Sequence, residues 1–96
     1  MVEHIFKPSC TLTFDQVPED SKRFFALLRE SEVVHFRLDL HDVTQCDSAG
    51  LAWLIEAKTL ATQHHKTIVM SGVPKAIHAL AQFCGIEAVL VDTILD

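Results

Sequence analysis

Six histidines in a 96-residue sequence raise the question of a metal site. His64 and His65 are adjacent, and side chains that are neighbours on a helix point about 100° apart, so the two rings do not converge. His35 and His41 have no cysteine or carboxylate at a standard ligand interval, and neither H-E-x-x-H nor C-x-x-C occurs. The pattern therefore favours surface histidines, and we expect neither a metal nor a cofactor.

A nucleophilic serine next to an acid occurs at Asp47-Ser48. Nothing around it resembles the G-x-S-x-G turn of hydrolases, and adjacent Asp and Ser side chains usually diverge. The glycines Gly50, Gly72 and Gly85 are too isolated to form a phosphate-binding loop, and no Walker lysine follows them. The sequence therefore predicts a protein that is not an enzyme and has no catalytic residues.

The segment Asp47-Ser48-Ala49-Gly50-Leu51 is better suited to binding than to catalysis. Asp47 is a typical N-cap, so Ser48 to Gly50 would form the first turn of a helix, where backbone N–H groups are unpaired and the helix dipole is positive. Gly50 would let another chain approach closely. On spacing alone, a docking surface and an ordinary capped helix are equally favoured.

The helix that follows Asp47 adds a signal of its own. On a helical wheel, the residues expected to face the sheet are Leu51, Leu54, Ile55 and Thr62. The residues on the opposite, outward side are Ala49, Trp53, Glu56 and Leu60. An outward tryptophan is typical of protein interfaces, and the alternative is that Trp53 folds onto a neighbouring loop or the C-terminal tail. The wheel favours docking to a protein partner.

These residues are positioned by a predicted alternation of strands and helices. Short apolar runs at residues 4–7 and 10–14 are expected to form a hairpin of two strands. The later strands are expected at 34–40, 67–71 and within 87–95, and the helices at about 18–30, 48–64 and 74–84. The order ββαβαβαβ predicts an α/β fold with a mixed sheet. Because strand 34–40 has one polar face, we expect the helices to pack mainly on one face of the sheet.

Length and charge narrow the functional classes further. A chain of this size is expected to form a single domain over residues 1–96, with no room for a deep cofactor cavity beside its core. The net charge of −5 argues against nucleic acid, and neither a signal peptide nor a membrane-spanning run is recognisable. Three widely spaced cysteines fit a reducing compartment. We therefore expect a cytoplasmic protein that does not insert into a membrane.

The segment that runs from Asp39-Leu40 through Val43 to Asp47-Ser48-x-Gly50-Leu51 resembles the signature of STAS domains. This family includes anti-sigma-factor antagonists and the cytoplasmic tails of sulfate transporters, and the likeness covers nearly the whole chain. The resemblance implies a STAS fold and a partner-binding surface centred on Ser48. Together with the wheel, it predicts that the partner-binding residues are Asp47, Ser48, Ala49, Gly50, Trp53 and Glu56.

Two branches of the family are candidates. In anti-sigma-factor antagonists, the serine at the position of Ser48 is phosphorylated, which switches partner binding. In the MlaB-like branch, a stand-alone STAS subunit binds the ATPase of an Mla-type ABC transporter for phospholipids. The sequence is more similar to the transporter subunit than to the antagonists at residues 71–74 and 85–90, and also at Ala49 and Ala52. Its C-terminus also looks too short for the fourth helix of typical antagonists.

The resemblance therefore favours a non-enzymatic subunit that binds and stabilises or regulates this ATPase, in phospholipid trafficking and outer-membrane lipid asymmetry. Such a subunit would be cytoplasmic and peripheral to the inner membrane through its partner. An antagonist switched by phosphorylation of Ser48 is the alternative.

Overall fold

The computed structural model describes residues 2–90, 93 and 94 of the chain. The strands are β1 (Glu3–Phe6), β2 (Thr11–Leu12), β3 (His35–Asp39), β4 (Gln45–Cys46) and β5 (Thr67–Ser71). The helices are α1 (Val17–Glu30), α2 (Ser48–Gln63), α3 (Lys75–Phe83) and α4 (Glu87–Leu90). A three-stranded sheet has the order β1-β3-β5, and β2 pairs with β4 in a separate ladder. Within the described ranges, no helix is long and apolar enough to cross a membrane.

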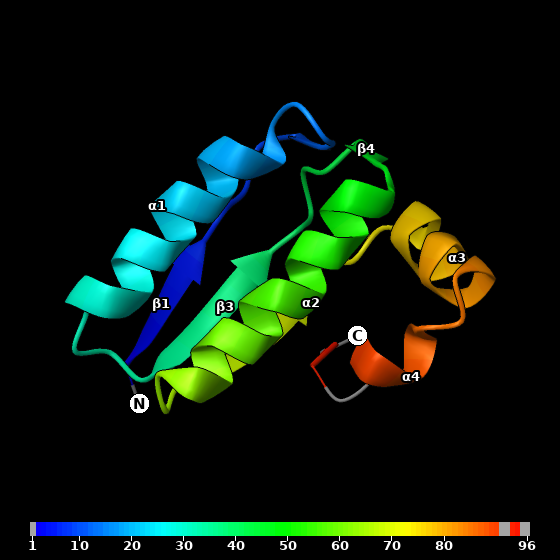
Figure 1. Cartoon of the computed structure of the whole chain (residues 1–96). Coiled ribbons are helices and arrows are strands. Elements are labelled where there is room, and N and C mark those ends of the chain that lie inside the picture. The colour runs from blue at the N-terminus through cyan, green and yellow to red at the C-terminus, as the bar shows by residue number, and fades with distance from the viewer. Residues whose placement is uncertain (1, 91–92, 95–96) are drawn as a thin grey trace.

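The predicted α/β class, with its helices mainly on one face of the sheet, is confirmed. Helices α1 and α2 lie side by side over the same face of the sheet, while α3 and α4 lie beyond its β5 edge (Figure 1). In β3, Phe36 and Leu38 are buried beneath the helices, and the alternating residues 35, 37 and 39 are partly exposed. The alternation of apolar and polar residues thus predicted correctly which side of β3 faces the core.

The predicted N-terminal hairpin is wrong, and so is the predicted mixed sheet, since every strand pair in the described part of the chain is parallel. β1 pairs with β3 and β2 pairs with β4, so the first two strands join different ladders. Between them, the main-chain N–H and the hydroxyl of Ser9 both donate to Asp20 of α1, at 3.1 and 3.0 Å. These bonds fix the segment between β1 and β2 to α1, and β2 then pairs with β4 instead of reversing onto β1.

The end of the chain also differs from the prediction. Residues 87–90 form the short helix α4 where a strand was expected. Gly85 has a left-handed φ of 73° and its N–H donates to Gln82 O at 3.1 Å, which ends α3 and redirects the chain. Of the predicted final strand, Ile94 makes one parallel bridge to Met70, and residues 91–92 and 95 lie outside the described residues.

The core between the two main helices and the sheet is aromatic. The Phe24 ring of α1 lies 5.3 Å from Phe6, 6.2 Å from Phe36 and 5.9 Å from Trp53, measured between ring centroids, with edge-to-face geometry in each case. Such contacts stabilise aromatic pairs beyond the area that they bury. Trp53 is only 3% exposed, so the prediction that its indole faces outward is wrong.

The helical wheel placed Trp53 on the wrong side of α2, and the packing of this helix explains why. The residues along the buried centre of this helix are Gly50, Leu54, Ala57 and Ala61. Three of the four are small, so the backbone of α2 approaches its neighbours closely, and side chains on both flanks of the centre line reach the core. Leu51 is buried on one flank and Trp53 on the other, whereas Thr62, which was expected to face the sheet, is exposed.

Candidate docking surface at the start of α2

The expected N-cap of α2 is confirmed, and its carboxylate has a second function. Asp47 Oδ1 accepts a hydrogen bond from Gly50 N at 3.1 Å, which caps the helix. Asp47 Oδ2 accepts another from Phe14 N at 3.0 Å, in the loop between β2 and α1. The bond from Phe14, and after it the bond from Gly50, lowers the pKa of the Asp47 carboxyl below its usual value. A charged carboxylate therefore joins two backbone segments at neutral pH.

Gly50 is required by contacts within the chain. A Cβ at this position would overlap the Leu12 carbonyl oxygen and lie 2.8 Å from the Leu12 Cβ atom. The Leu12 carbonyl also accepts from Asp47 N at 3.1 Å, so β2 lies directly against the first turn of α2. The close approach that Gly50 permits is therefore made by β2 of the same molecule, and Gly50 is buried.

The remaining predicted partner-binding residues divide between the surface and the interior. Ser48, the first residue of α2, is exposed, Asp47 and Ala49 are partly buried, and Glu56 is exposed about two turns further along the same helix. Trp53 lies in the core and does not reach this surface. The exposed residues of α2 are Ser48, Ala52, Glu56, Thr59, Thr62 and Gln63.

The structure adds Phe14, a residue that sequence reasoning missed. Its side chain is 75% exposed, and its backbone N–H is the group bound by Asp47. The sequence carried a signal in the form of an aromatic residue followed by Asp15 and Gln16, in front of the helix that begins at Val17. Assigning residues 10–14 to one strand of a hairpin hid this signal, because the strand ends at Leu12.

The thiol nearest this turn is unsuited to nucleophilic chemistry. Burial, with a smaller contribution from the Asp47 carboxylate, raises the pKa of the Cys46 thiol to about 11. The group is therefore protonated at neutral pH. Among the described residues, no group of three or more His, Cys, Asp or Glu side chains could hold a metal ion.

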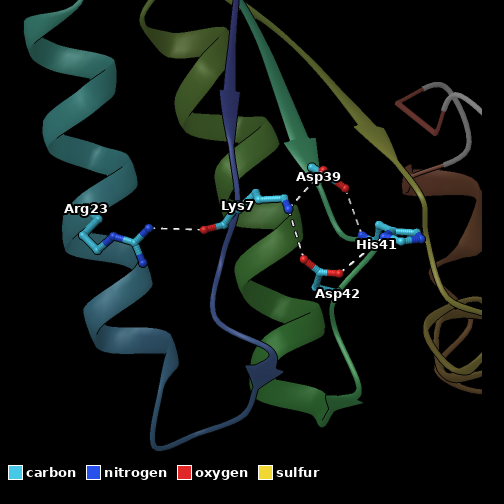
Figure 2. Close-up of polar contacts among 5 residues, drawn as sticks. All are labelled: Lys7, Arg23, Asp39, His41 and Asp42. Atoms are coloured by element: carbon cyan, nitrogen blue, oxygen red, sulfur yellow. Dashed lines mark hydrogen bonds and ion pairs between the residues drawn. The ribbon is translucent and has the colours of Figure 1, made fainter.

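A second group of polar side chains lies where β1 and β3 end. Figure 2 shows Lys7 between two carboxylates, with its Nζ 3.0 Å from Asp42 Oδ2 and 4.0 Å from Asp39 Oδ2. The main-chain N–H of His41 donates to Asp39 Oδ1 at 3.0 Å, and Arg23 Nη2 donates to the Lys7 carbonyl at 3.2 Å. The hydrogen bond with Asp42 raises the pKa of Lys7 and lowers that of Asp42. This group balances its own charges and ties β1 to the loop after β3.

Comparison with known proteins identifies the family. The family model described as "Mlab, STAS domain" matches residues 9–92. A crystal structure of a sulfate transporter family protein from Wolinella succinogenes superimposes with a TM-score of 0.73 and 19% sequence identity, covering 96% of this chain and 75% of that one. At that identity the likeness shows the fold alone, and the curated proteins contain no match. Because the family match includes the Asp47 cap, α2 and most of the chain, this protein belongs to the MlaB-like family of STAS domains.

Proposed function

We propose that the chain is a non-enzymatic cytoplasmic subunit that binds and stabilises or regulates the ATPase of an Mla-type ABC transporter. In this role it would serve phospholipid trafficking and outer-membrane lipid asymmetry, and its partner would hold it at the inner membrane. The observation that carries the proposal is the MlaB-like family match, which spans the exposed start of α2.

The geometry at the start of α2 supports a role in docking. Ser48 is exposed on a turn whose backbone is bound both to its own cap and to β2, so this surface is ordered before a partner arrives. A preordered surface loses less conformational entropy on binding. In the proposed complex, apolar contact supplies most of the affinity, and the polar turn at Asp47 and Ser48 sets the register.

Co-purification tests this proposal. The tagged protein is expressed with the ATPase subunit of the Mla-type transporter from the same genome, and the ATPase is measured in the eluate. Ser48→Arg puts a long cation on the exposed first turn, so we expect it to abolish co-purification without changing the thermal unfolding temperature. Gln82→Arg, at an exposed position of α3, is the matched control and should bind normally. Undiminished binding of the Ser48→Arg protein would refute the proposed surface.

A second candidate function rests on the exposure of Ser48 itself. Its hydroxyl lies at the N-terminus of a 16-residue helix, where a phosphate group is electrostatically favourable. An anti-sigma-factor antagonist would be phosphorylated there by a partner kinase. Incubation with ATP and an extract of the native cells, followed by mass spectrometry, distinguishes the two functions. Stoichiometric phosphate on Ser48 would favour the antagonist, and an unmodified Ser48 together with ATPase binding would favour the transporter subunit.

A further inference from the structure

The Phe14 side chain is exposed on a well-ordered turn. Phe14 is 75% exposed, although the backbone on both sides of it is hydrogen-bonded. Gln16 N and Val17 N both donate to Thr13 O at 2.9 Å, which links the turn directly to the start of α1. Phe14 N donates to Asp47 Oδ2 at 3.0 Å. These bonds therefore hold the Phe14 backbone at a defined position, from which its side chain is exposed to solvent.

The bond to Asp47 also places the Phe14 backbone beside the first turn of α2. The other oxygen of the same carboxylate caps α2 through Gly50 N, and Asp47 N donates to Leu12 O at 3.1 Å. Asp47 thus links the two exposed residues, because its carboxylate binds the Phe14 backbone and Ser48 follows it in the chain. Exposed large apolar residues are common on proteins and do not by themselves indicate an interface. One that lies on a fixed backbone beside a polar turn is a stronger indication of a binding surface.

The charges around Phe14 indicate the chemistry of a matching surface. Asp15 follows it and is exposed, Glu19 is exposed in the first turn of α1, and Asp47 carries a charge at neutral pH. The nearest cations along the chain are Lys7, which is bound to Asp42, and the exposed Lys22, one turn beyond Glu19. A partner that buries the ring would therefore need an apolar pocket and would gain from basic residues around it.

We propose that Phe14 is the aromatic anchor of the docking surface, and that its ring enters an apolar pocket with a basic rim on the ATPase. Asp47 is the positioning residue, because it holds the Phe14 backbone against the start of α2. This inference rests on the proposed function and adds to it the residue that supplies most of the affinity. Aromatic residues held rigidly at the centre of an interface are typical of such anchors.

Calorimetric titration with the purified ATPase subunit tests the anchor. We expect Phe14→Ala to weaken binding by about 30-fold or more, as loss of an interface anchor does, with no change in the unfolding temperature. Phe83→Ala removes an equally large ring that is 90% exposed at the end of α3, and should leave affinity within about twofold of the unmodified protein. Phe14→Leu, which keeps an apolar side chain, should recover part of the affinity.

The outcomes separate this inference from the proposed function. If Ser48→Arg abolishes binding and Phe14→Ala leaves it unchanged, the anchor is wrong and the proposed function stands. If the unmodified protein does not bind the ATPase, both are wrong. Equal losses from Phe14→Ala and Phe83→Ala would also overturn the anchor, because the effect would then follow exposure alone.

Asp47 requires a separate test, because its loss also removes a helix cap. In a double-mutant cycle, Asp47→Ala should weaken binding strongly in the normal background and much less when Phe14 is already alanine. Hydrogen exchange of the Phe14 amide should accelerate in the Asp47→Ala protein. Fully additive losses, or an unchanged exchange rate, would exclude the positioning role.

The basic rim predicts a dependence on salt. Asp15→Asn removes one exposed charge beside the ring, so it should weaken binding a few-fold at low ionic strength and flatten the fall of affinity with added NaCl. Glu30→Gln, at an exposed position near the far end of α1, is the control and should leave both unchanged. An Asp15→Asn protein with the normal salt dependence would exclude the basic rim.

Discussion

Two exposed phenylalanines lie at differently built places in this molecule. Phe14 is 75% exposed beside the start of α2, and Asp47 binds its backbone from a distant part of the sequence. Phe83 is 90% exposed at the last position of α3, where no side chain from another element of the described chain bonds to it. The chain then turns at Gly85, and a Cβ added to Gly85 would meet no other atom within 4 Å.

The difference shows that exposure alone is a weak signal of function. Near Phe14, local bonds within the turn are joined by two bonds between segments that are remote in sequence, Phe14 N to Asp47 Oδ2 at 3.0 Å and Asp47 N to Leu12 O at 3.1 Å. These two bonds fix the turn against the start of α2. At the α3–α4 corner, the bonds of the turn are local, such as Gly85 N to Gln82 O at 3.1 Å and Ile86 N to Ala81 O at 3.0 Å. A rigid surface binds with a lower entropic cost, which favours the α2 end as the docking site.

The largest effect should come from the core beneath the α2 end. Trp53→Ala removes an indole that is 3% exposed, and should lower the free energy of unfolding by about 3–5 kcal/mol in urea denaturation at pH 7. Phe83→Ala, which removes an exposed ring, should change it by less than about 0.5 kcal/mol. Similar values for the two variants would contradict the burial of Trp53. For the same reason, Trp53→Glu would disrupt the fold and cannot test docking.

Glycine substitutions compare the backbones of the two regions. Gly50→Ala places a methyl group onto the Leu12 carbonyl, which the surrounding strand cannot move away from, so we expect a loss of about 3 kcal/mol. Gly85→Ala meets no neighbouring atom, and its cost of about 1–2 kcal/mol comes only from the left-handed φ of 73°. Urea denaturation measures both. The reverse order would mean that α2 and β2 do not pack as closely as described.

The Asp47 cap should make the α2 end sensitive to acid. Because the folded-state pKa is lowered, the carboxylate stabilises the fold above its ordinary value of 3.8, and this contribution is lost as the pH falls through the folded-state pKa. Asp47→Ala should therefore be less stable than the unmodified protein at pH 7, and the difference should shrink below about pH 4. Thermal unfolding between pH 3 and 7 measures this difference in stability, and Asp15→Asn is the control. A difference that does not change with pH would contradict the stabilising role of the Asp47 carboxylate.

Thiol labelling compares the same regions without changing stability. Cys46, beside the α2 turn, has a pKa of about 11, whereas Cys84 is exposed directly after Phe83. Since the thiolate is the reactive form, iodoacetamide at pH 8 should modify Cys46 at least about tenfold more slowly than Cys84. Mass spectrometry of peptides after timed quenching measures both rates, and the Cys46→Ser protein identifies the signal. Faster labelling of Cys46 would show that this turn opens in solution.

Much of the fold could be predicted because its signals are local. The strand expected at 67–71 is β5, and the alternation of 34–40 correctly predicted the buried side of β3. The N-cap at Asp47 depends on one side chain and the turn that follows it, so it was also predictable. The hairpin failed because parallel pairing of β1 with β3 joins residues more than thirty positions apart, such as Glu3 and His35.

By itself, therefore, the sequence determined the α/β class, the likeness to STAS domains and the capped turn at Ser48, because periodicity and capping act over a few residues. Only the tertiary structure decided which side of α2 is buried, and with it the place of Trp53 in the core. It also decided that Leu12 lies against Gly50 and that Phe14 is bound to Asp47. These contacts depend on how closely separate elements pack, which no local pattern specifies.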